Sequence, residues 1–446
     1  MAKAKSTRGT GTKRAATAGR DGPIFADILP GSLRGRAGFF RLGKTEDGAW
    51  WLISPEDEPV FLRAIAGVNR HGRAGLAPVR RSAYSQTVEH LYGAAGAGGL
   101  GWEKSTAARL HAWGVDTVGP WADAGLVDRG FYFTALAHFI RAAVPTVHGP
   151  GVRLPDVFDP RWPAAAEAHA AAVAAPWAGR RELAGWFTDD ALGWGGEDPA
   201  RPGLFQVFLG LEPSLAAHHA AWEFALASNG GTLDELGRRW GVALGHREHM
   251  RQLVREEKPV AGAAFAEDAE RFARELARRY FSVVGKSLRA ADPAHLVLGC
   301  RFATVPAAGV GAAAAGVPEV DAVSWRLRPR ATFAEQAAGC AGEAPQWVTG
   351  GGMSHGDFRS LPLRDGTGPS RLERLLRAGR EGMVAACRDP RTVAIEWAHW
   401  ANNADELPPF GAGLVHADDQ EAVEHTELVT HIHLRARALH RHGIRI

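Results

Sequence analysis

Two short apolar runs of this chain have carboxyl side chains at or near their ends, and these groups can donate and accept protons. Asp189 and Asp190 close the run 184–190, and Glu396 lies near the end of the run 393–400. Two carboxyl groups that face one cleft can divide the roles of acid/base and nucleophile between them. Asp190 with Glu396 is therefore a candidate catalytic pair. For both aspartates, capping and hydrogen bonding where a strand exits into a loop is an equally good interpretation.

The elements that would position these carboxyl groups follow a regular order. Eight apolar runs have strand character: 60–68, 116–121, 131–137, 184–190, 296–302, 321–327, 346–350 and 393–400. Helix-like segments lie between them, for example 102–113, 162–175, 263–290 and 372–386. Strands that alternate with helices predict an α/β fold with a parallel sheet, and eight of them predict a closed (β/α)8 TIM barrel. Residues 38–53 predict an N-terminal β-hairpin, and the long stretch 191–295 predicts a helical insertion after strand 4.

Composition suits one large globular fold. The chain has 446 residues, 46% hydrophobic and 23% charged, with a net charge of +3 that gives no global argument for nucleic acid. Cys300, Cys340 and Cys387 are far apart and odd in number, so we expect neither disulfides nor a zinc cluster, and a reducing, cytoplasmic location. No segment approaches 18 apolar residues, so we expect no membrane partner.

The first residues are basic. Lys3, Lys5, Arg8, Lys13, Arg14 and Arg20 occur without an acid, which predicts a disordered basic tail over 1–35 before a barrel domain over 36–446. Weak attraction of this tail to nucleic acid is the alternative. The segment 232–242 is similar to the first half of a helix-turn-helix, but it lies inside the barrel pattern, so we favour a helical insertion beside a cleft.

Tryptophan is used unusually often, with fifteen tryptophans against four tyrosines. Several stand near the ends of predicted strands, among them Trp121, Trp194, Trp325, Trp397 and Trp400. An indole can stack on the C–H face of a sugar ring, and core packing is the alternative for each of them. The histidines show no metal-ligand spacing, and Gly350-Gly351-Gly352 lacks the lysine and serine of a phosphate loop, so we expect no cofactor and no metal.

From about residue 36 to 442 the order of short motifs resembles the agarase-related glycoside hydrolases of the large retaining (β/α)8 clan. The motifs are Gly38-Phe39-Phe40-Arg41, Trp50-Trp51-Leu52-Ile53-Ser54-Pro55-Glu56, Val68-Asn69, Thr106-Ala107-Ala108-Arg109-Leu110, Trp113-Gly114-Val115-Asp116-Thr117, Pro155-Asp156-Val157-Phe158-Asp159-Pro160, Ala291 through Phe302 and Gly413-Leu414-Val415. The resemblance implies a barrel with an oligosaccharide as the ligand. It says nothing of the oligomeric state.

The chain departs from that family where the family carries its catalytic glutamates. Strand 4 of the family ends Asp-Asn-Glu-Leu, and here it ends Asp189-Asp190-Ala191-Leu192. Strand 7 of the family ends in a glutamate, and here Thr349 is followed by Gly350. A retaining glycosidase needs two carboxyl groups about 5 Å apart, and neither Ala191 nor Gly350 can move a proton.

Two functions follow from these observations. The first is a catalytically inactive glycoside-hydrolase-like barrel that binds a carbohydrate or serves as a scaffold. The alternative is an active hydrolase, agarase- or β-galactosidase-like, that uses the relocated carboxylates Asp190 and Glu396, with Asp189 as a further candidate. A separation of about 6.5–9.5 Å would suit an inverting mechanism. The residues expected to bind substrate are Asn69, Trp121, Trp194, Trp325, Trp397, His399 and Trp400.

Overall fold

A curled sheet of nine parallel strands forms the centre of the molecule. The computed structural model describes residues 22–72, 81–93, 100–196, 198–328, 332–340, 342–350, 371–402 and 413–442. The strand order is β11-β9-β6-β5-β4-β15-β14-β13-β12. The strands are β4 (Leu62–Ala66), β5 (Thr117–Val118), β6 (Tyr132–Leu136), β9 (Leu183–Phe187), β11 (Leu296–Val297), β12 (Arg301–Phe302), β13 (Val323–Arg326), β14 (Gln346–Thr349) and β15 (Thr392–Ala398).

The two ends of this order belong to one short segment, residues 296–302. β11 pairs with β9, and β12 pairs with β13 on the other side. An isolated parallel bridge joins Asp190 to Arg301, and the amide of Ala191 donates to the carbonyl of Arg301 (3.1 Å). The sheet therefore curls far enough for one segment to contact both of its sides, which is consistent with a barrel.

Side chains from alternate positions of the strands fill the interior of the curled sheet. Leu62, Ala64, Leu296 and Trp347 belong to this interior cluster. One end is closed by the antiparallel sheet of β1 (Arg41–Lys44), β2 (Trp50–Ile53) and β3 (Pro59–Val60), whose Phe40, Leu42, Trp50 and Leu52 belong to the same cluster. The predicted hairpin thus buries one face of alternating side chains against the interior.

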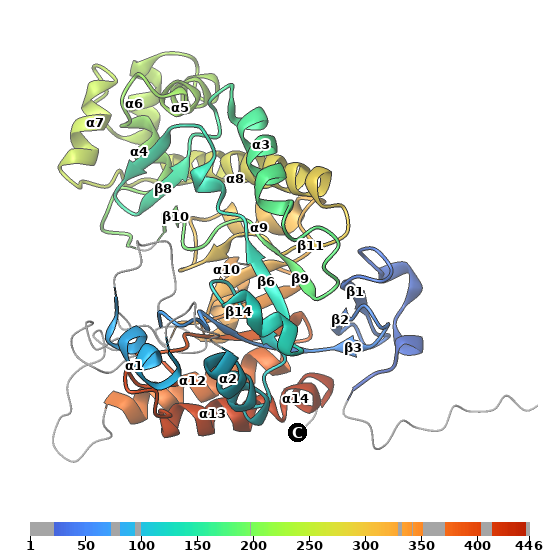
Figure 1. Cartoon of the computed structure of the whole chain (residues 1–446). Helices are drawn as coiled ribbons and strands as arrows, with labels where there is room; N and C mark the ends of the chain where they lie inside the picture. Colours follow the sequence, from blue (N-terminus) through green and yellow to red (C-terminus); the bar gives the residue numbers. More distant parts are fainter. Residues whose placement is uncertain are drawn as a thin grey trace, which may run out of the picture.

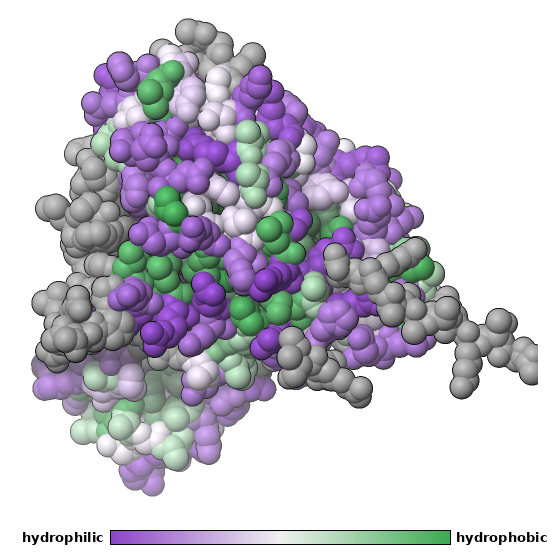
Figure 2. All heavy atoms as spheres, turned by 90° about the horizontal axis from the view of Figure 1, so that it is seen from below, coloured by the Kyte–Doolittle hydropathy of each residue, from purple (hydrophilic) through white to green (hydrophobic). Residues whose placement is uncertain are grey.

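Helices cover the outer face of the sheet (Figure 1). They include α1 (Ala83–Tyr92), α2 (Leu100–Ala112), α3 (Trp162–Ala174), α8 (Ala263–Ala291), α9 (Val310–Gly316), α10 (Phe333–Cys340), α12 (Arg371–Arg388), α13 (Val423–His433) and α14 (Ala436–His442). In α8 the buried residues Phe272, Leu276 and Tyr280 recur at helical spacing, so one stripe of this long helix faces the core. On the face in Figure 2, apolar and hydrophilic residues occur in patches, as on ordinary protein surfaces.

A second lobe lies above the sheet in Figure 1. It contains the antiparallel sheet of β7 (Thr146–Gly149), β8 (Val152–Pro155) and β10 (Gly193–Trp194), followed by α4 (Leu204–Leu209), α5 (Ala216–Ala227), α6 (Leu233–Trp240) and α7 (Glu248–Arg255). The segment similar to a helix-turn-helix contains α6. Its Trp240 donates from Nε1 to Asp268 Oδ2 in α8 (2.9 Å), so α6 packs against α8.

All eight segments predicted as strands contain a strand, and the four helix-like segments named from the sequence contain α2, α3, α8 and α12. The expected disordered tail differs in its boundary, because two 3₁₀ helices, η1 (Phe25–Asp27) and η2 (Pro30–Ser32), precede residue 35. Backbone bonds from Leu29 to Lys44 and between Arg34 and Leu42 fix this region against β1. Residues 1–21 lie outside the described residues. No described helix is long and apolar enough to cross a membrane.

A buried histidine makes the fold sensitive to acid. His433 in α13 is 1% exposed, and its Nδ1 lies 3.2 Å from the carbonyl of Trp113. Burial lowers the pKa of His433 to about 3. In the unfolded chain a histidine titrates near 6.5, so the unfolded state binds the proton first. The stability that depends on neutral His433 is therefore complete above pH 6.5 and lost as the pH falls toward 3.

We expect His433→Asn to flatten this acid dependence. Between pH 7 and pH 4 the wild-type protein should lose about 3 kcal/mol more unfolding free energy than the variant. Urea unfolding at a series of pH values measures the difference. The control is His431→Asn, which changes an exposed histidine of the same helix and should keep the wild-type profile. Parallel profiles for His433→Asn and wild type would contradict this account.

Candidate functional site

An arginine occupies the end of the sheet where the carboxyl ends of the strands meet. Arg301 of β12 donates from Nη2 to Oε1 of Glu396 in β15, and its Nη1 lies 3.4 Å from Oδ1 of Asp190 after β9. The side chains of Arg301 and Glu396 are 2% and 0% exposed, and that of Asp190 is 16% exposed. The structure thus brings Asp190 and Glu396 together, with a cation in contact with both.

Two aromatic rings hold the guanidinium in place. Its central carbon lies 5.4 Å from the ring centroid of Trp121 and 5.2 Å from that of Phe187. A planar, weakly hydrated guanidinium is suited to such contacts. Burial raises the pKa of Glu396, and the neighbouring Arg301 opposes that shift. Each charge is the buried partner of the other, so removal of either side chain would leave an uncompensated buried charge.

Gly119, directly after β5, makes room for the carboxylate. A Cβ at this residue would lie 2.5 Å from Oε2 of Glu396 and 3.0 Å from the Cα of Ala66. Any larger residue would displace the carboxyl group. In the segment Gly119-Pro120-Trp121, the glycine thus leaves space for the Glu396 carboxylate and the tryptophan contacts the Arg301 guanidinium.

Ala191 and Gly350, where the sequence led us to expect that the family's glutamates are replaced, both have a left-handed backbone conformation. Ala191 has a φ of 53° and is exposed, while Gly350 has a φ of 72°. A Cβ on Gly350 would lie 2.4 Å from Cγ of Arg326, so the stem of that arginine takes the space of a side chain here. In the described structure, neither position offers a group that can exchange a proton. Gly351 and Gly352 lie outside the described residues.

Asp189 faces away from the carboxyl pair. Its Oδ2 accepts a hydrogen bond from the hydroxyl of Tyr280 in α8 (2.6 Å), and its Oδ1 accepts one from the amide of Ile140 (3.1 Å). Full burial raises the pKa of Asp189 to about 7, although these two hydrogen bonds oppose the shift. Asp189 thus links the end of β9 to α8 and to the segment after β6 by hydrogen bonds. This is the structural role that the sequence offered as the alternative to catalysis.

Four of the five candidate tryptophans lie in the core. Trp194 stacks on Phe281 (5.6 Å between centroids), and Trp325 donates from Nε1 to Gln346 Oε1 (3.0 Å). Trp397 contacts His425, and Trp400 donates from Nε1 to the hydroxyl of Tyr84 (2.8 Å). None of these four is more than 3% exposed. In this conformation they present no face to a ligand.

The remaining candidates lie near the ends of the first, second and eighth strands of the chain order predicted from the sequence. Trp121 is half-buried with a φ of 65°. Asn69 is buried and donates from Nδ2 to the carbonyl of Trp121 (2.8 Å), so it positions that backbone. His399 is half-buried beyond β15. Trp121 is thus the candidate aromatic that contacts Arg301.

Two residues at this site were missed from the sequence. The sequence signal for Arg301 is a single charge that directly follows the apolar run Leu296-Val297-Leu298-Gly299-Cys300. His138 follows β6 with a φ of 60°, and burial lowers its pKa to about 4. Asp190 and Arg301 both act on His138 electrostatically. Among the residues that the structure describes, no group of three or more His, Cys, Asp or Glu side chains could hold a metal ion.

Comparison with known proteins identifies agarases as relatives. No family model matches the chain. Beta-agarase B of Vibrio sp. (strain JT0107) is 23% identical over 380 residues, which cover 68% of this chain and 38% of that protein. Beta-agarase A of the same organism is 24% identical over 317 residues, covering 59% and 31%. The chain therefore spans less than two fifths of the length of the curated relatives it matches.

Solved structures show the same fold. An exo-beta-agarase superposes with a TM-score of 0.71 at 19% identity, covering 94% of this chain and 68% of that one. The protein BpGH50 superposes with a TM-score of 0.63 at 15% identity, covering 95% and 88%. The chain is thus similar to agarases in sequence, and it shares the fold of a solved agarase.

The ion pair gives a prediction for stability. We expect Arg301→Met to lower the free energy of unfolding by about 3–5 kcal/mol, because it leaves the Glu396 carboxylate buried without its partner. Adding Glu396→Gln should recover most of the loss, as coupled neighbours do. Urea unfolding at pH 7 measures both. The control is Arg274→Met, which breaks the exposed Arg274–Glu270 pair and should cost under about 1 kcal/mol. A double variant no more stable than Arg301→Met would contradict the pairing.

The backbone at Gly350 gives a second prediction. Gly350→Ala should lower stability by more than the roughly 1–2 kcal/mol expected for a left-handed residue alone, because its Cβ meets the Arg326 stem. Gly130→Ala is the matched control, since Gly130 has a φ of 91° and nothing lies within 4 Å of its Cβ position. In an Arg326→Ala background, Gly350→Ala should cost no more than Gly130→Ala, because the clashing side chain is gone. Equal losses at both glycines in thermal and urea unfolding would show that Arg326 does not fill this space.

Proposed function

We propose that this protein is a non-hydrolytic relative of the agarases that binds a neutral oligosaccharide at the carboxyl ends of its barrel strands. The observation that carries the proposal is the Arg301 guanidinium, held between Glu396 and Asp190. A barrel can keep the cleft of its relatives while the residues at the strand ends change its function.

Acetal hydrolysis needs an acid that protonates the leaving oxygen and a carboxylate that attacks or activates water. Ala191 and Gly350 supply neither. Glu396 is fully buried and bonded to Arg301, so the ion pair withholds it from both roles. Asp190 alone cannot act as both acid and base.

The same region can bind an oligosaccharide, because it has buried polar atoms that make no hydrogen bond within the protein. Nε and Nη1 of Arg301, Oε2 of Glu396 and Nε1 of Trp121 are buried and make no hydrogen bond. Sugar hydroxyls donate and accept hydrogen bonds, so they can satisfy groups of both kinds. The indole of Trp121 could also support the C–H face of a sugar ring.

We also propose how the strands and helices correspond to a complete barrel. We take β11 and β12 as one interrupted strand, which makes a closed (β/α)8 barrel of eight strands with the hairpin at its N-terminal end. The lobe with α4–α7 is then the helical insertion after strand 4, and the basic residues before Gly22 form the tail. All three cysteines are buried and free, which supports a reducing, cytoplasmic location. A scaffold without a ligand is the alternative form of a non-hydrolytic barrel, and it predicts no effect of an oligosaccharide on stability.

An active hydrolase is the second candidate function. The observation in its favour is that Asp190 and Glu396 contact the same guanidinium, so both carboxylates belong to one site. Movement of Arg301 away from them on substrate binding would free a carboxyl pair.

The two functions differ in turnover. We expect agarotetraose to raise the melting temperature in a concentration-dependent way, because a ligand that binds only the folded state stabilises it. Mass spectrometry of the same mixture should show no product above that of the Asp190→Asn/Glu396→Gln double variant, which controls for contaminating enzymes. Product that forms with wild type and disappears with the double variant would establish the second function. Absence of stabilisation would contradict the binding proposal.

A further inference from the structure

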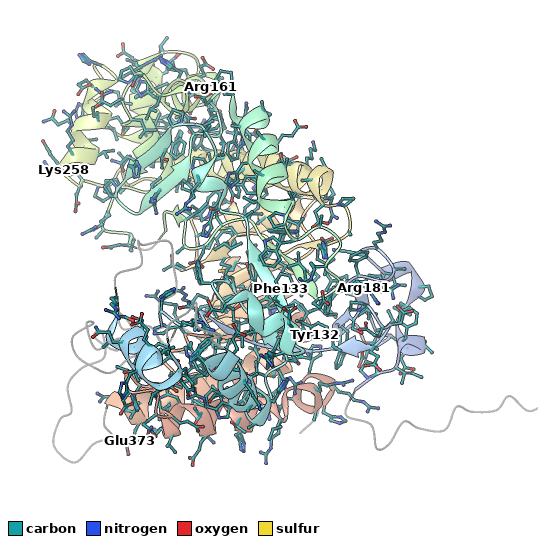
Figure 3. The ribbon with its side chains drawn as sticks, viewed as in Figure 1. Tyr132, Phe133, Arg161, Arg181, Lys258 and Glu373 are labelled. Carbon is teal, nitrogen blue, oxygen red and sulfur yellow. The ribbon has the colours of Figure 1, made fainter. Side chains whose placement is uncertain are left out.

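A pocket lies beside the point where β5 and β6 part. Only Thr117–Tyr132 and Val118–Phe133 pair these strands, after which β6 continues to Leu136 without β5. Tyr132 and Phe133 are labelled at the start of β6 in Figure 3. The pocket has a volume of about 350 Å³, within the range of small-molecule sites. Its lining includes Gly119, Trp121, Thr134, His138, Trp177 and Trp186.

Two polar side-chain atoms of the residues that line this pocket make no hydrogen bond. Nε1 of Trp121 and Oγ1 of Thr134 are buried and make no hydrogen bond, and Thr134 is 4% exposed. Thr134 lies between Tyr132 and Leu136, which both pack toward the barrel interior, so its side chain shares that face. Folded proteins leave few buried polar groups unpaired, and a cluster of them at one cavity points to a ligand.

Two residues that line the pocket also contact the ion pair. Gly119 lines the pocket, and the Cβ position of Gly119 is 2.5 Å from Oε2 of Glu396, the oxygen that Arg301 does not engage. Trp121 lines the pocket and lies under the Arg301 guanidinium. The ion pair therefore lies directly behind Gly119 and Trp121 of the pocket lining.

The chemistry of these atoms selects the ligand. Trp121 Nε1 can only donate, an ionised Glu396 Oε2 can only accept, and Thr134 Oγ1 can do both. A ligand with several hydroxyl groups can form hydrogen bonds with all three atoms, because a hydroxyl both donates and accepts. An anionic sugar would bring its charge close to Glu396 and Asp190, which disfavours it. The apolar surfaces of Trp177, Trp186 and Phe133 suit the C–H faces of a ring.

We propose that this pocket receives a single neutral hexopyranose ring, the terminal ring of the oligosaccharide in the proposed function, on which this inference rests. The ring hydroxyls bond to Trp121 Nε1, Thr134 Oγ1 and Glu396 Oε2. The ring then lies at the ends of β5 and β6, away from the ends of β9 and β14, where the relatives' glutamates would stand. Ala191 and Gly350 are therefore compatible with retained binding.

Isothermal titration with D-galactose and with agarotetraose tests the assignment. Thr134→Val and Trp121→Phe should each weaken the binding of both sugars about five- to tenfold, the effect of one lost hydrogen bond. Their melting temperatures without ligand should not fall by more than those of the controls, because neither atom has a partner in the free protein. Val173→Trp, which fills the pocket from α3, should abolish binding.

Matched controls separate the pocket from general effects of losing a buried polar atom. Thr106→Val and Trp50→Phe remove buried, unpartnered atoms in α2 and β2, away from the pocket lining, and should leave both affinities unchanged. Equal weakening by controls and pocket variants would overturn the assignment.

The outcomes distinguish this inference from the function on which it rests. If wild type binds neither sugar, the proposed function fails and the inference fails with it. If wild type binds and the three pocket variants bind with wild-type affinity, the proposed function stands and the pocket assignment is wrong. If agarotetraose binds and galactose neither binds nor competes with it, the single-ring proposal is overturned.

Discussion

A buried positive charge is the constraint on which the candidate site depends. Arg301 is almost completely buried, and a charge in that position requires a partner of opposite sign. Glu396 provides it from the facing strand, and Asp190 adds a second, partly exposed carboxylate. Gly119 leaves space for the Glu396 carboxyl group, and Trp121 and Phe187 enclose the guanidinium. One ion pair thus accounts for residues at the ends of four strands.

The same ion pair relates the fold to the proposed loss of chemistry. Arg301 lies in the segment 296–302, which contacts both sides of the curled sheet, so its side chain reaches the interior from the place where those sides meet. Ala191 and Gly350 stand where the resemblance places the family's two glutamates, and the Arg326 stem fills the space beside Gly350. Two carboxylates near the strand ends are bound to other side chains of the protein. Glu396 accepts a hydrogen bond from Arg301, and Asp189 accepts one from Tyr280. Stability and hydrolysis would compete for the same groups.

The fold was largely predictable from the sequence because its signals are local. Apolar runs of strand length between amphipathic helices located all eight strand segments, and alternating residues located the hairpin at Trp50–Ile53. The small sheet of β7, β8 and β10 was missed, because its strands are only two to four residues long and one of them comes from beyond β9. The tail boundary was placed too late, because the bonds from Leu29 and Arg34 to β1 are made with residues distant in sequence.

The site was less predictable, because it depends on which way each side chain faces. Trp325 and Trp397 stand at strand ends as expected, but they point to the outer helices, and only the register of the strands decides this. Arg301 gave a signal, a lone charge in an apolar run, whereas the role of Gly119 depends on a contact with β15. Asp190 and Glu396 were identified as a pair, yet the cation between them changes what that pair can do.

The most direct measurement of the central claim is a crystal structure of the protein with agarotetraose. The account predicts that Arg301 stays hydrogen-bonded to Glu396 and that sugar hydroxyls, but no anomeric carbon, contact its carboxylate. An anomeric carbon within about 3–3.5 Å of a Glu396 or Asp190 oxygen, with Arg301 moved away, would contradict it, because that is the geometry of a reacting pair.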